Sequence, residues 1–343
     1  YPNNPKKDSG NETATKQEAQ DWTLIKPAAY YKDGRSEGIG SSPKGDTNSN
    51  EDVIMGLKVV SVRANNPKQG LPLVPATILL LDAPSGIIHA ALAGTYITAM
   101  RTSAGPALAV QAFQPHVQEL VIFGAGAQAD CHIQLMELAV QRTIPKITIV
   151  NRTIERAKEL QATIQKRRNE RKDNNNTNND CVLKVVALSD TNAIASALAT
   201  ADVVAATTNA TTPLWKDDDD DETIQLKDGC LITGIGSYTP DMQEIPTSVA
   251  NRSVVVIDTP EAIQVGDLKH LGTSLESAAA NHPIHLAGHA LVDPNRVLEA
   301  RTSTGKNFVF YKAVGTAIQD VLTAHVVVKK AKDLGIGQEV DMS

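Results

Sequence analysis

The chain has 343 residues, of which 41% are hydrophobic and only 3% aromatic, and its formal net charge is −6. This length predicts two domains with cores made mainly of Ala, Val, Leu and Ile, and the negative charge argues against a broad nucleic-acid-binding surface. The cysteines Cys131, Cys181 and Cys230 lack metal-ligand or disulfide spacing, so we predict no metal site and a reducing, cytoplasmic location. No apolar run is long enough to cross a membrane.

The N-terminal third of the sequence predicts the first part of a domain. Residues 1–52 are mostly polar, and we expect them to be partly disordered or truncated, with Trp22–Tyr31 as the segment able to pack. Three aliphatic segments are predicted strands, and a turn signal at residues 82–86 joins the last two into a hairpin. An Ala-rich helix follows. The strands are Val53–Val62, Ala76–Leu81 and Ile87–Leu92, and the helix is Ala99–Phe113.

From residue 114 to residue 306, short apolar runs alternate with helical patterns. Such alternation is typical of a doubly wound parallel sheet with helices on both faces. The predicted strands are Leu120–Phe123, Lys146–Val150, Leu183–Leu188, Asp202–Ala206, Cys230–Ile235 and Ser253–Ile257, and the predicted helices are Ala127–Val140, Thr153–Arg168 and Asn192–Ala199.

Two low-complexity segments interrupt this pattern, an Asn-rich one at 167–180 and an acidic one at 216–222. We interpret both as solvated loop insertions, because a cation site needs spaced and oriented oxygens rather than the flexible run Asp217–Asp221. After residue 258 the pattern is irregular until Asn307–Val328, which is compatible with a helix.

The predicted fold class is therefore α/β. A Rossmann domain with a doubly wound parallel sheet occupies residues 114–306. A discontinuous α+β domain for substrate binding and dimerisation is built from residues 1–113 and 307–343, because a C-terminal helix that follows a Rossmann unit is expected to return to the first domain.

The strongest motif is Gly124-Ala125-Gly126-Ala127-Gln128-Ala129, which follows a predicted strand and opens a predicted helix. Gly124 permits the tight turn, Gly126 lets a pyrophosphate approach the backbone, and Ala129 keeps the helix close to the sheet. The free N–H groups of the helix N-terminus attract the phosphates. With the strands around it, this motif predicts a dinucleotide site.

The end of the second strand indicates which dinucleotide is bound. NAD sites usually carry a carboxylate there, whereas this chain has Asn151, Arg152 and Thr153, so NADPH is favoured and NAD stays possible. After the fourth strand, Thr207 and Thr208 are predicted to contact the cofactor, although small polar residues also serve as simple turn formers.

Two cations stand in apolar surroundings. Lys58 lies inside a predicted strand, and Arg101 lies at the start of the Ala-rich helix. A charge in such a place costs free energy unless an anion meets it, and a substrate carboxylate or a phosphate would do so. The alternative is that each is a surface residue whose stem packs on apolar neighbours.

Several segments together resemble the successive motifs of the ornithine cyclodeaminase/mu-crystallin family, in the family's order. The resemblance extends from about residue 53 to residue 337, and Asn151–Thr153 is similar to the mu-crystallin branch, whose members resemble NADPH-dependent reductases of cyclic ketimines. The segments are Gly56–Val60, Gly94–Ala104, Val121–Gln128, Ala201–Thr208, Gly234–Glu244 and Val314–Asp320.

The resemblance implies roles for the matched positions. Lys58 and Arg101 would be catalytic by clamping the substrate α-carboxylate, and Thr77 would lie beside the nicotinamide or the substrate. A homodimer through the first domain is also implied. The implied cofactor contacts are Gly124, Ala125, Gly126, Ala127 and Gln128 at the phosphates, and Val314 and Gly315 at the nicotinamide.

The sequence departs from the family pattern at two places. Cyclodeaminases carry an aspartate after the fifth strand that engages the substrate's amine, and Tyr238 takes that position here. Family members also carry a carboxylate-binding arginine upstream of the Lys58 strand, and Arg35 is the only arginine in that stretch.

The leading hypothesis is an NADPH-dependent reductase of small cyclic ketimine carboxylates. The alternatives are an ornithine cyclodeaminase that uses NAD and yields proline, a related amino-acid dehydrogenase, and a non-catalytic protein that binds NADPH and a small ligand. Water or Lys58 could protonate the product nitrogen, and His289 is a candidate by residue type alone.

Overall fold

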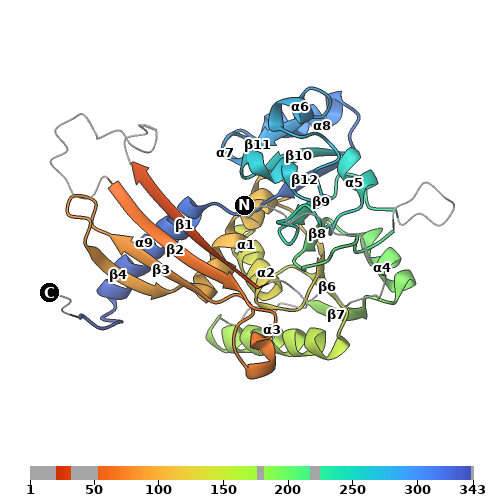
Figure 1. The fold of residues 1–343 in the computed structure, drawn as a ribbon. Helices are drawn as coiled ribbons and strands as arrows, with labels where there is room; N and C mark the ends of the chain where they lie inside the picture. The colour runs from red at the N-terminus through yellow and green to blue at the C-terminus, as the bar shows by residue number, and fades with distance from the viewer. Residues whose placement is uncertain (1–20, 32–52, 176–180, 217–224, 341–343) are drawn as a thin grey trace, which may run out of the picture.

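The computed structural model describes residues 21–31, 53–175, 181–216 and 225–340, with the backbone only at 171–175. Two β-sheets organise these residues (Figure 1). A small antiparallel sheet with one long helix behind it forms the lobe on the left of the view, and a large parallel sheet with helices on both faces forms the lobe on the right.

The larger sheet has eight parallel strands within the described residues, in the order β11-β10-β12-β9-β8-β5-β6-β7, which confirms the predicted α/β fold. The strand order reverses between β5 and β8, and the crevice at such a point is where doubly wound sheets bind dinucleotides. The strands are β5 (Glu119–Phe123), β6 (Lys146–Asn151), β7 (Val182–Ala187), β8 (Val203–Ala206), β9 (Leu231–Gly234), β10 (Ser253–Ile257), β11 (Ile284–Leu286) and β12 (Phe308–Lys312).

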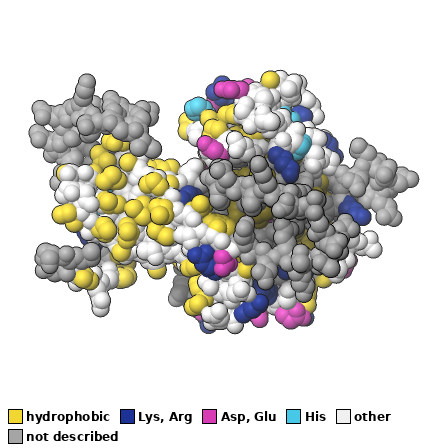
Figure 2. All heavy atoms as spheres, in the orientation of Figure 1, with side chains coloured by type: hydrophobic (Ala, Val, Ile, Leu, Met, Phe, Trp, Pro, Cys, Tyr) yellow, Lys and Arg dark blue, Asp and Glu magenta, His cyan; other side chains and the backbone are white. Residues whose placement is uncertain are grey.

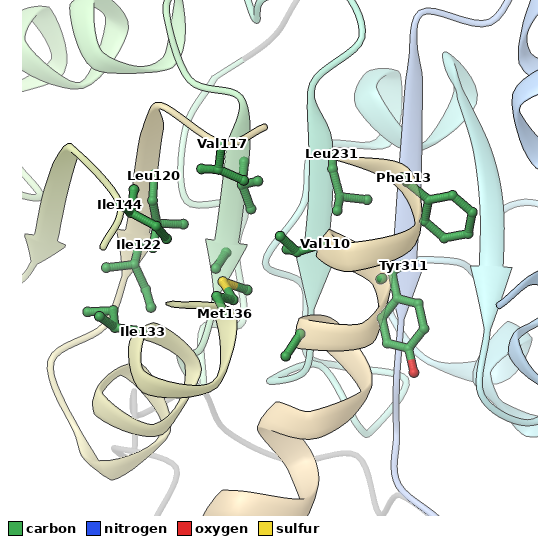
Figure 3. Packing of buried hydrophobic residues seen from close by; sticks show 14 of the residues in the cluster. Val110, Phe113, Val117, Leu120, Ile122, Ile133, Met136, Ile144, Leu231 and Tyr311 are labelled. Carbon is green, nitrogen blue, oxygen red and sulfur yellow. The ribbon is translucent and has the colours of Figure 1, made fainter. Parts of the chain in front are cut away.

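Helices cover both faces of this sheet, so its central strands are buried at every position and read as continuous apolar runs. Figure 3 shows Val110 and Phe113 of α1 beside Leu231 and Tyr311 of the sheet. The helices are α1 (Gly94–Phe113), α2 (Ala127–Ala139), α3 (Ile154–Asn175), α4 (Thr191–Leu198), α5 (Thr247–Asn251), α6 (Leu275–Ala279), α7 (Ala287–Ala290) and α8 (Pro294–Ser303), with short 3-10 turns at Asn66–Gln69 and Pro260–Gln264.

One predicted element is wrong. The helix-compatible pattern Asn307–Val328 begins with a strand, β12, which lies between β10 and β9 and is buried along its whole length. The run Phe-Val-Phe-Tyr is aromatic and β-branched, and burial on both faces removes the alternation that marks a strand. Residues 307–312 therefore belong to the Rossmann domain, and the first domain resumes after them.

The smaller sheet has the antiparallel order β1-β2-β3-β4, and helix α9 (Ala317–Asp333) packs on one of its faces. The alternating residues Gly56, Lys58 and Val60 of β2 are buried on that face. β1 was not predicted as a strand, and α1 begins directly after β4, five residues earlier than expected. The strands are β1 (Trp22–Tyr31), β2 (Val53–Val62), β3 (Ala76–Leu81) and β4 (Ile88–Ala93).

The predicted insertion at 167–180 is wrong in its first part. Residues 167–175 continue α3, and Arg167 forms an ion pair with Asp130 of α2 at 2.7 Å. Residues 176–180 and the acidic run 217–221 lie outside the described residues. Among the described helices, none has the length and apolar character needed to cross a membrane.

Candidate active site between the two domains

The predicted nucleotide turn lies at the carboxyl end of β5. Gly124 has a φ of +111°, and a side chain there would collide with Thr207, so glycine is required on both counts. A Cβ added to Gly126 would meet nothing within 4 Å, which leaves open space in front of the turn. No side chain caps α2, so its first N–H groups can bind phosphate oxygens. The turn from Gly124 to Gln128 thus fits a pyrophosphate.

Thr207 and Thr208 lie across the crevice at the end of β8. Thr207 donates a hydrogen bond from Oγ1 to the carbonyl of Phe123 at 2.7 Å, which fixes the end of β8 against the nucleotide turn. The N–H and hydroxyl of Thr208 both donate to Glu244 Oε1. Its own donors are therefore occupied, and Thr208 positions the crevice wall rather than offering donors to a ligand.

The end of β6 carries the residues expected to select the cofactor. The Asn151 side chain donates to the carbonyl of Thr153 at 2.8 Å and closes the turn. Arg152 is exposed and has no hydrogen bond or ion pair among the described residues. Its guanidinium is therefore available to an anion.

The two predicted cations meet at the boundary between the lobes, together with a third. Lys58 Nζ lies 2.7 Å and Arg101 Nε 2.8 Å from Asp320 Oδ1, and Lys26 Nζ lies 4.0 Å from Asp320 Oδ2. Lys26 of β1 is the direct cross-strand neighbour of Lys58 in β2. We call Lys26, Lys58, Arg101 and Asp320 the Asp320 cluster.

The Asp320 cluster is deeply buried but not saturated. Lys58 is 1% exposed and Arg101 9% exposed, and Asp320 is fully buried. Arg101 donates from Nη1 to Gln319 Oε1, whereas its Nε and Nη2 make no hydrogen bond among the described residues. Asp320 Oδ2 accepts no hydrogen bond either. Unmade bonds at a buried charged group are costly, so they mark a place where a ligand would be stabilised.

The electrostatics of the cluster follow from burial. Loss of solvent lowers the pKa of Lys58 to about 8, with the positive charge of Arg101 acting in the same direction and Asp320 opposing it. Burial, followed by the charge of Arg101, also lowers the pKa of Lys26. An added anion would raise the pKa of both lysines, so anion binding and lysine protonation favour each other.

Val314 and Gly315 join the cluster to the carboxyl edge of the large sheet. Asp258, which follows β10, accepts hydrogen bonds from the N–H groups of Val314 at 3.1 Å and Gly315 at 2.7 Å. The Gly315 carbonyl accepts from Lys26 Nζ at 3.1 Å. Gly315 has a φ of +79°, and a side chain there would collide with the Arg101 guanidinium. Gly315, one of the two predicted nicotinamide residues, therefore touches two of the cations directly.

Other predicted residues lie elsewhere. In the pairing of β2 with β3, Thr77 lies opposite Val59, whereas Ile78 lies opposite Lys58. Successive side chains of a strand point to opposite faces of the sheet, so Thr77 lies on the face away from the Asp320 cluster. The structure thus does not bring Thr77 to this site within one chain. Arg35 lies outside the described residues, and His289 is exposed on α7 beside the edge strand β11.

Sequence reasoning missed Asp320 and Lys26. Asp320 supplies part of the anion that we assigned wholly to a substrate, although it ends the matched segment Val314–Asp320. Lys26 stands in the segment that packs before the first predicted strand. A lysine at the matching place in two adjacent strands is visible only once their register is known.

A second buried ionic group lies behind the crevice wall. Lys312 Nζ donates to Asp267 Oδ2 at 2.9 Å, and Asp267 Oδ1 accepts from the N–H groups of Glu244 and Ile245. Glu244 in turn accepts from Thr208 and from the Gly236 N–H at 2.6 Å. Burial raises the pKa of Glu244. This Glu244 network ties the segments that follow β8, β9 and β10 to the end of β12.

The fold and the site define a two-lobed, dinucleotide-binding protein with a cluster of buried cations where the two sheets meet. The sequence profile of the ornithine cyclodeaminase/mu-crystallin family matches residues 43–335. The chain belongs to this family.

Individual relatives agree with that assignment. The chain is 31% identical over 303 residues to an uncharacterized cyclodeaminase of Dictyostelium discoideum, covering 85% of this chain and 80% of the relative. It is 28% identical to a Delta(1)-pyrroline-2-carboxylate reductase of Bacillus cereus over 84% of this chain and 80% of that protein. The solved Thermococcus litoralis Delta(1)-pyrroline-2-carboxylate reductase, in complex with NADH and L-proline, has 24% identity and a TM-score of 0.62, covering 83% of this chain and 80% of that one.

Proposed function

We propose that the protein reduces the C=N bond of small cyclic ketimine carboxylates with NADPH. It is an NAD(P)H-dependent oxidoreductase of the ornithine cyclodeaminase/mu-crystallin family, in which a relative is named a Delta(1)-pyrroline-2-carboxylate reductase. The observation that carries the substrate class is the Asp320 cluster, which places three cations beside Gly315 at the carboxyl edge of the large sheet.

The charges of the cleft favour a monocarboxylate. Lys26, Lys58 and Arg101 contribute three positive charges, and Asp320 and Asp258 contribute two negative ones, so one positive charge is left over when all five groups are ionised. The Nη2 of Arg101, which makes no hydrogen bond among the described residues, and the partly exposed ammonium of Lys26 would be the groups available to a ligand. A carboxylate held there would fix the adjacent imine carbon, and positioning of this kind supplies much of the catalysis.

The bound cofactor would supply the hydride, which is chemistry that protein side chains lack. The residues that would hold it are the turn Gly124–Gln128 for the pyrophosphate and Val314–Gly315 for the nicotinamide. Asn151, Arg152 and Thr153 support NADPH over NADH, because the free guanidinium of Arg152 suits a 2′-phosphate and no carboxylate of this turn opposes it.

A cyclodeaminase is the second candidate, favoured by the name of the Dictyostelium discoideum relative. Such an enzyme needs a carboxylate for the substrate's second amine, and Tyr238 stands where the family carries it. The two activities differ in cofactor balance. A reductase consumes NADPH in proportion to imine, whereas a cyclodeaminase releases ammonia from ornithine with no net change in NAD.

The deciding experiment combines nucleotide binding with turnover. Fluorescence titration with NADPH and NADH comes first, followed by NADPH oxidation with pyrroline- and piperideine-2-carboxylate. NADPH-dependent reduction of either imine supports the proposal. Nucleotide binding with ammonia release from ornithine supports the cyclodeaminase, and binding without any turnover supports a non-catalytic binding protein.

We also propose a homodimer formed through the outer face of the small sheet, opposite α9. Figure 2 shows hydrophobic side chains gathered over β1–β4, and Ile25 is 68% exposed there. An apolar face of this extent is typical of an interface. Sedimentation equilibrium should give a dimer that Ile25→Glu converts to a monomer, and a wild-type monomer would reject the proposal.

A further inference from the structure

The first strand carries apolar residues on the same face as its cation. Residues i, i+2 and i+4 of a strand share one face, so Trp22, Leu24 and Lys26 all project from the side of β1 that bears the Asp320 cluster. Lys26 reaches the Gly315 carbonyl near the start of α9. Leu24 is 49% exposed although its cross-strand neighbour Val60 is buried. The cation-bearing face therefore continues as an exposed apolar surface towards Trp22.

A residue of the other domain meets this surface. Tyr238 lies in the segment that follows β9, and β9 is the neighbour of β12, whose continuation holds Gly315. The rings of Tyr238 and Trp22 meet edge to face, with centroids 6.0 Å apart and an interplanar angle of 67°. Tyr238 is still 39% exposed. One aromatic pair thus spans the two domains on the cation-bearing side of β1, four residues along the strand from Lys26.

We propose that Trp22, Leu24 and Tyr238 form the apolar side of the substrate site, so that the preferred ketimine carries an apolar ring substituent on the side away from its carboxylate. This inference rests on the proposed function and names its substrate class. In a ketimine whose carboxylate is held by Lys26 and Arg101, the ring atoms away from the carboxylate would face this apolar side, which we call the apolar wall. Burying an apolar group there removes it from water and covers the exposed faces of Leu24 and Tyr238.

The same wall disfavours a substrate with a second, charged amine. The cleft already holds one surplus positive charge, and another cation would be repelled. The carboxylates behind the loop do not offset this, because Glu244 accepts bonds from Thr208 and Gly236, and Asp267 pairs with Lys312. The position that would favour an amine is thus filled by a phenol.

The test compares three piperideine-2-carboxylates that differ at the ring carbon farthest from the carboxylate. The first is unsubstituted, the second carries an apolar group (alkyl or phenyl), and the third carries an aminomethyl group. The wild type should have its highest kcat/KM with the apolar substituent and its lowest with the amine. Tyr238→Ala and Leu24→Asn should each lower the ratio of apolar-substituted to unsubstituted kcat/KM about tenfold. Tyr238→Asp should invert the order between the apolar and the amine substrates.

The matched control is Tyr30→Ala. Tyr30 has the same 39% exposure as Tyr238 but lies at the other end of β1, so the substrate ratio should stay as in the wild type. Tyr238→Phe should keep the ratio, because the ring and not the hydroxyl makes the contact. Equal losses for all three substrates in Tyr238→Ala and Leu24→Asn would overturn the proposal.

A binding measurement separates this inference from the proposed function. The chain has two tryptophans, and Trp215 is 5% exposed, so Trp215→Phe leaves Trp22 as the emitting side chain. Titration with the corresponding cyclic amino acids in the presence of NADP should change Trp22 emission, with the apolar-substituted one binding at least tenfold more tightly. If no imine is reduced, the proposed function fails. The titration still tests whether Trp22, Leu24 and Tyr238 bind an apolar ring substituent. Equal affinity for all three amino acids would reject the proposed apolar side of the substrate site.

Discussion

The Asp320 cluster and the Glu244 network both contain buried lysine and carboxylate side chains, but they differ in how fully their hydrogen bonds are made. Both place lysine and carboxylates in a nearly dry interior. In the Glu244 network the Glu244 carboxylate accepts three bonds, and both oxygens of Asp267 are engaged. In the Asp320 cluster, Asp320 Oδ2 and two nitrogens of Arg101 have no hydrogen bond among the described residues, and the cations outnumber the carboxylates.

The difference indicates which buried charges serve structure and which serve a ligand. A saturated network gains nothing from a further partner, so we assign it to holding loops together. A cluster with surplus positive charge and unused guanidinium N–H donors is stabilised by an anion, so we assign it to ligand binding.

The largest effect is expected in the saturated network. Lys312→Met leaves Asp267 buried without its cation, so the free energy of unfolding should fall by about 3–5 kcal/mol in urea denaturation. Lys312→Met combined with Asp267→Asn removes both charges and should recover part of that loss. A single variant as stable as the wild type would show that the network is not structural.

Arg101→Gln tests the unsaturated cluster. The substrate carboxylate loses its charged partner, and kcat/KM for the ketimine should fall about 10²–10³-fold, equivalent to about 3–4 kcal/mol. The midpoint of thermal unfolding should change little, because Lys58 still neutralises Asp320. An unfolding midpoint that falls as far as in Lys312→Met would remove the distinction between the two groups.

The pH dependence of ligand binding follows from the lowered pKa of Lys58. Below about pH 8 Lys58 is protonated and attracts the carboxylate, and above it the charge is lost, so the dissociation constant for the cyclic amino acid should rise as pH increases through about 8. The pKa of Lys26 is also lowered, so loss of its charge weakens ligand binding in the same direction. Lys58→Met should bind more weakly throughout and lose most of this pH dependence. Tighter binding at higher pH would contradict the assignment.

The smallest effect is expected at Arg152, which is exposed. Arg152→Ala should weaken NADPH binding about tenfold and leave NADH binding nearly unchanged, because only the 2′-phosphate accepts the charge-assisted hydrogen bonds. The matched control is Arg156→Ala, an exposed arginine in the first turn of α3, four residues after Arg152. Equal weakening of both nucleotides in Arg152→Ala would argue against NADPH preference.

Much of the Rossmann domain could be predicted because its signals are local. The turn Gly124–Ala129 has its glycines at fixed offsets after an apolar strand, and the alternation around it gives the parallel sheet. β12 escaped because its neighbours are 50 or more residues away and its burial on both faces removes any alternation. β1 escaped because its burial is partial and irregular.

The sequence by itself determined the nucleotide turn, the α/β class and the two cations that stand out in apolar segments, since these depend on residue type and short spacing. Only the tertiary structure decided what the cations meet. Asp320 lies 262 residues from Lys58 in the chain and Lys26 lies across a strand pair, so no spacing rule joins them. Long-range packing also turned Thr77 away from the site, because the register of two strands decides which face a side chain occupies.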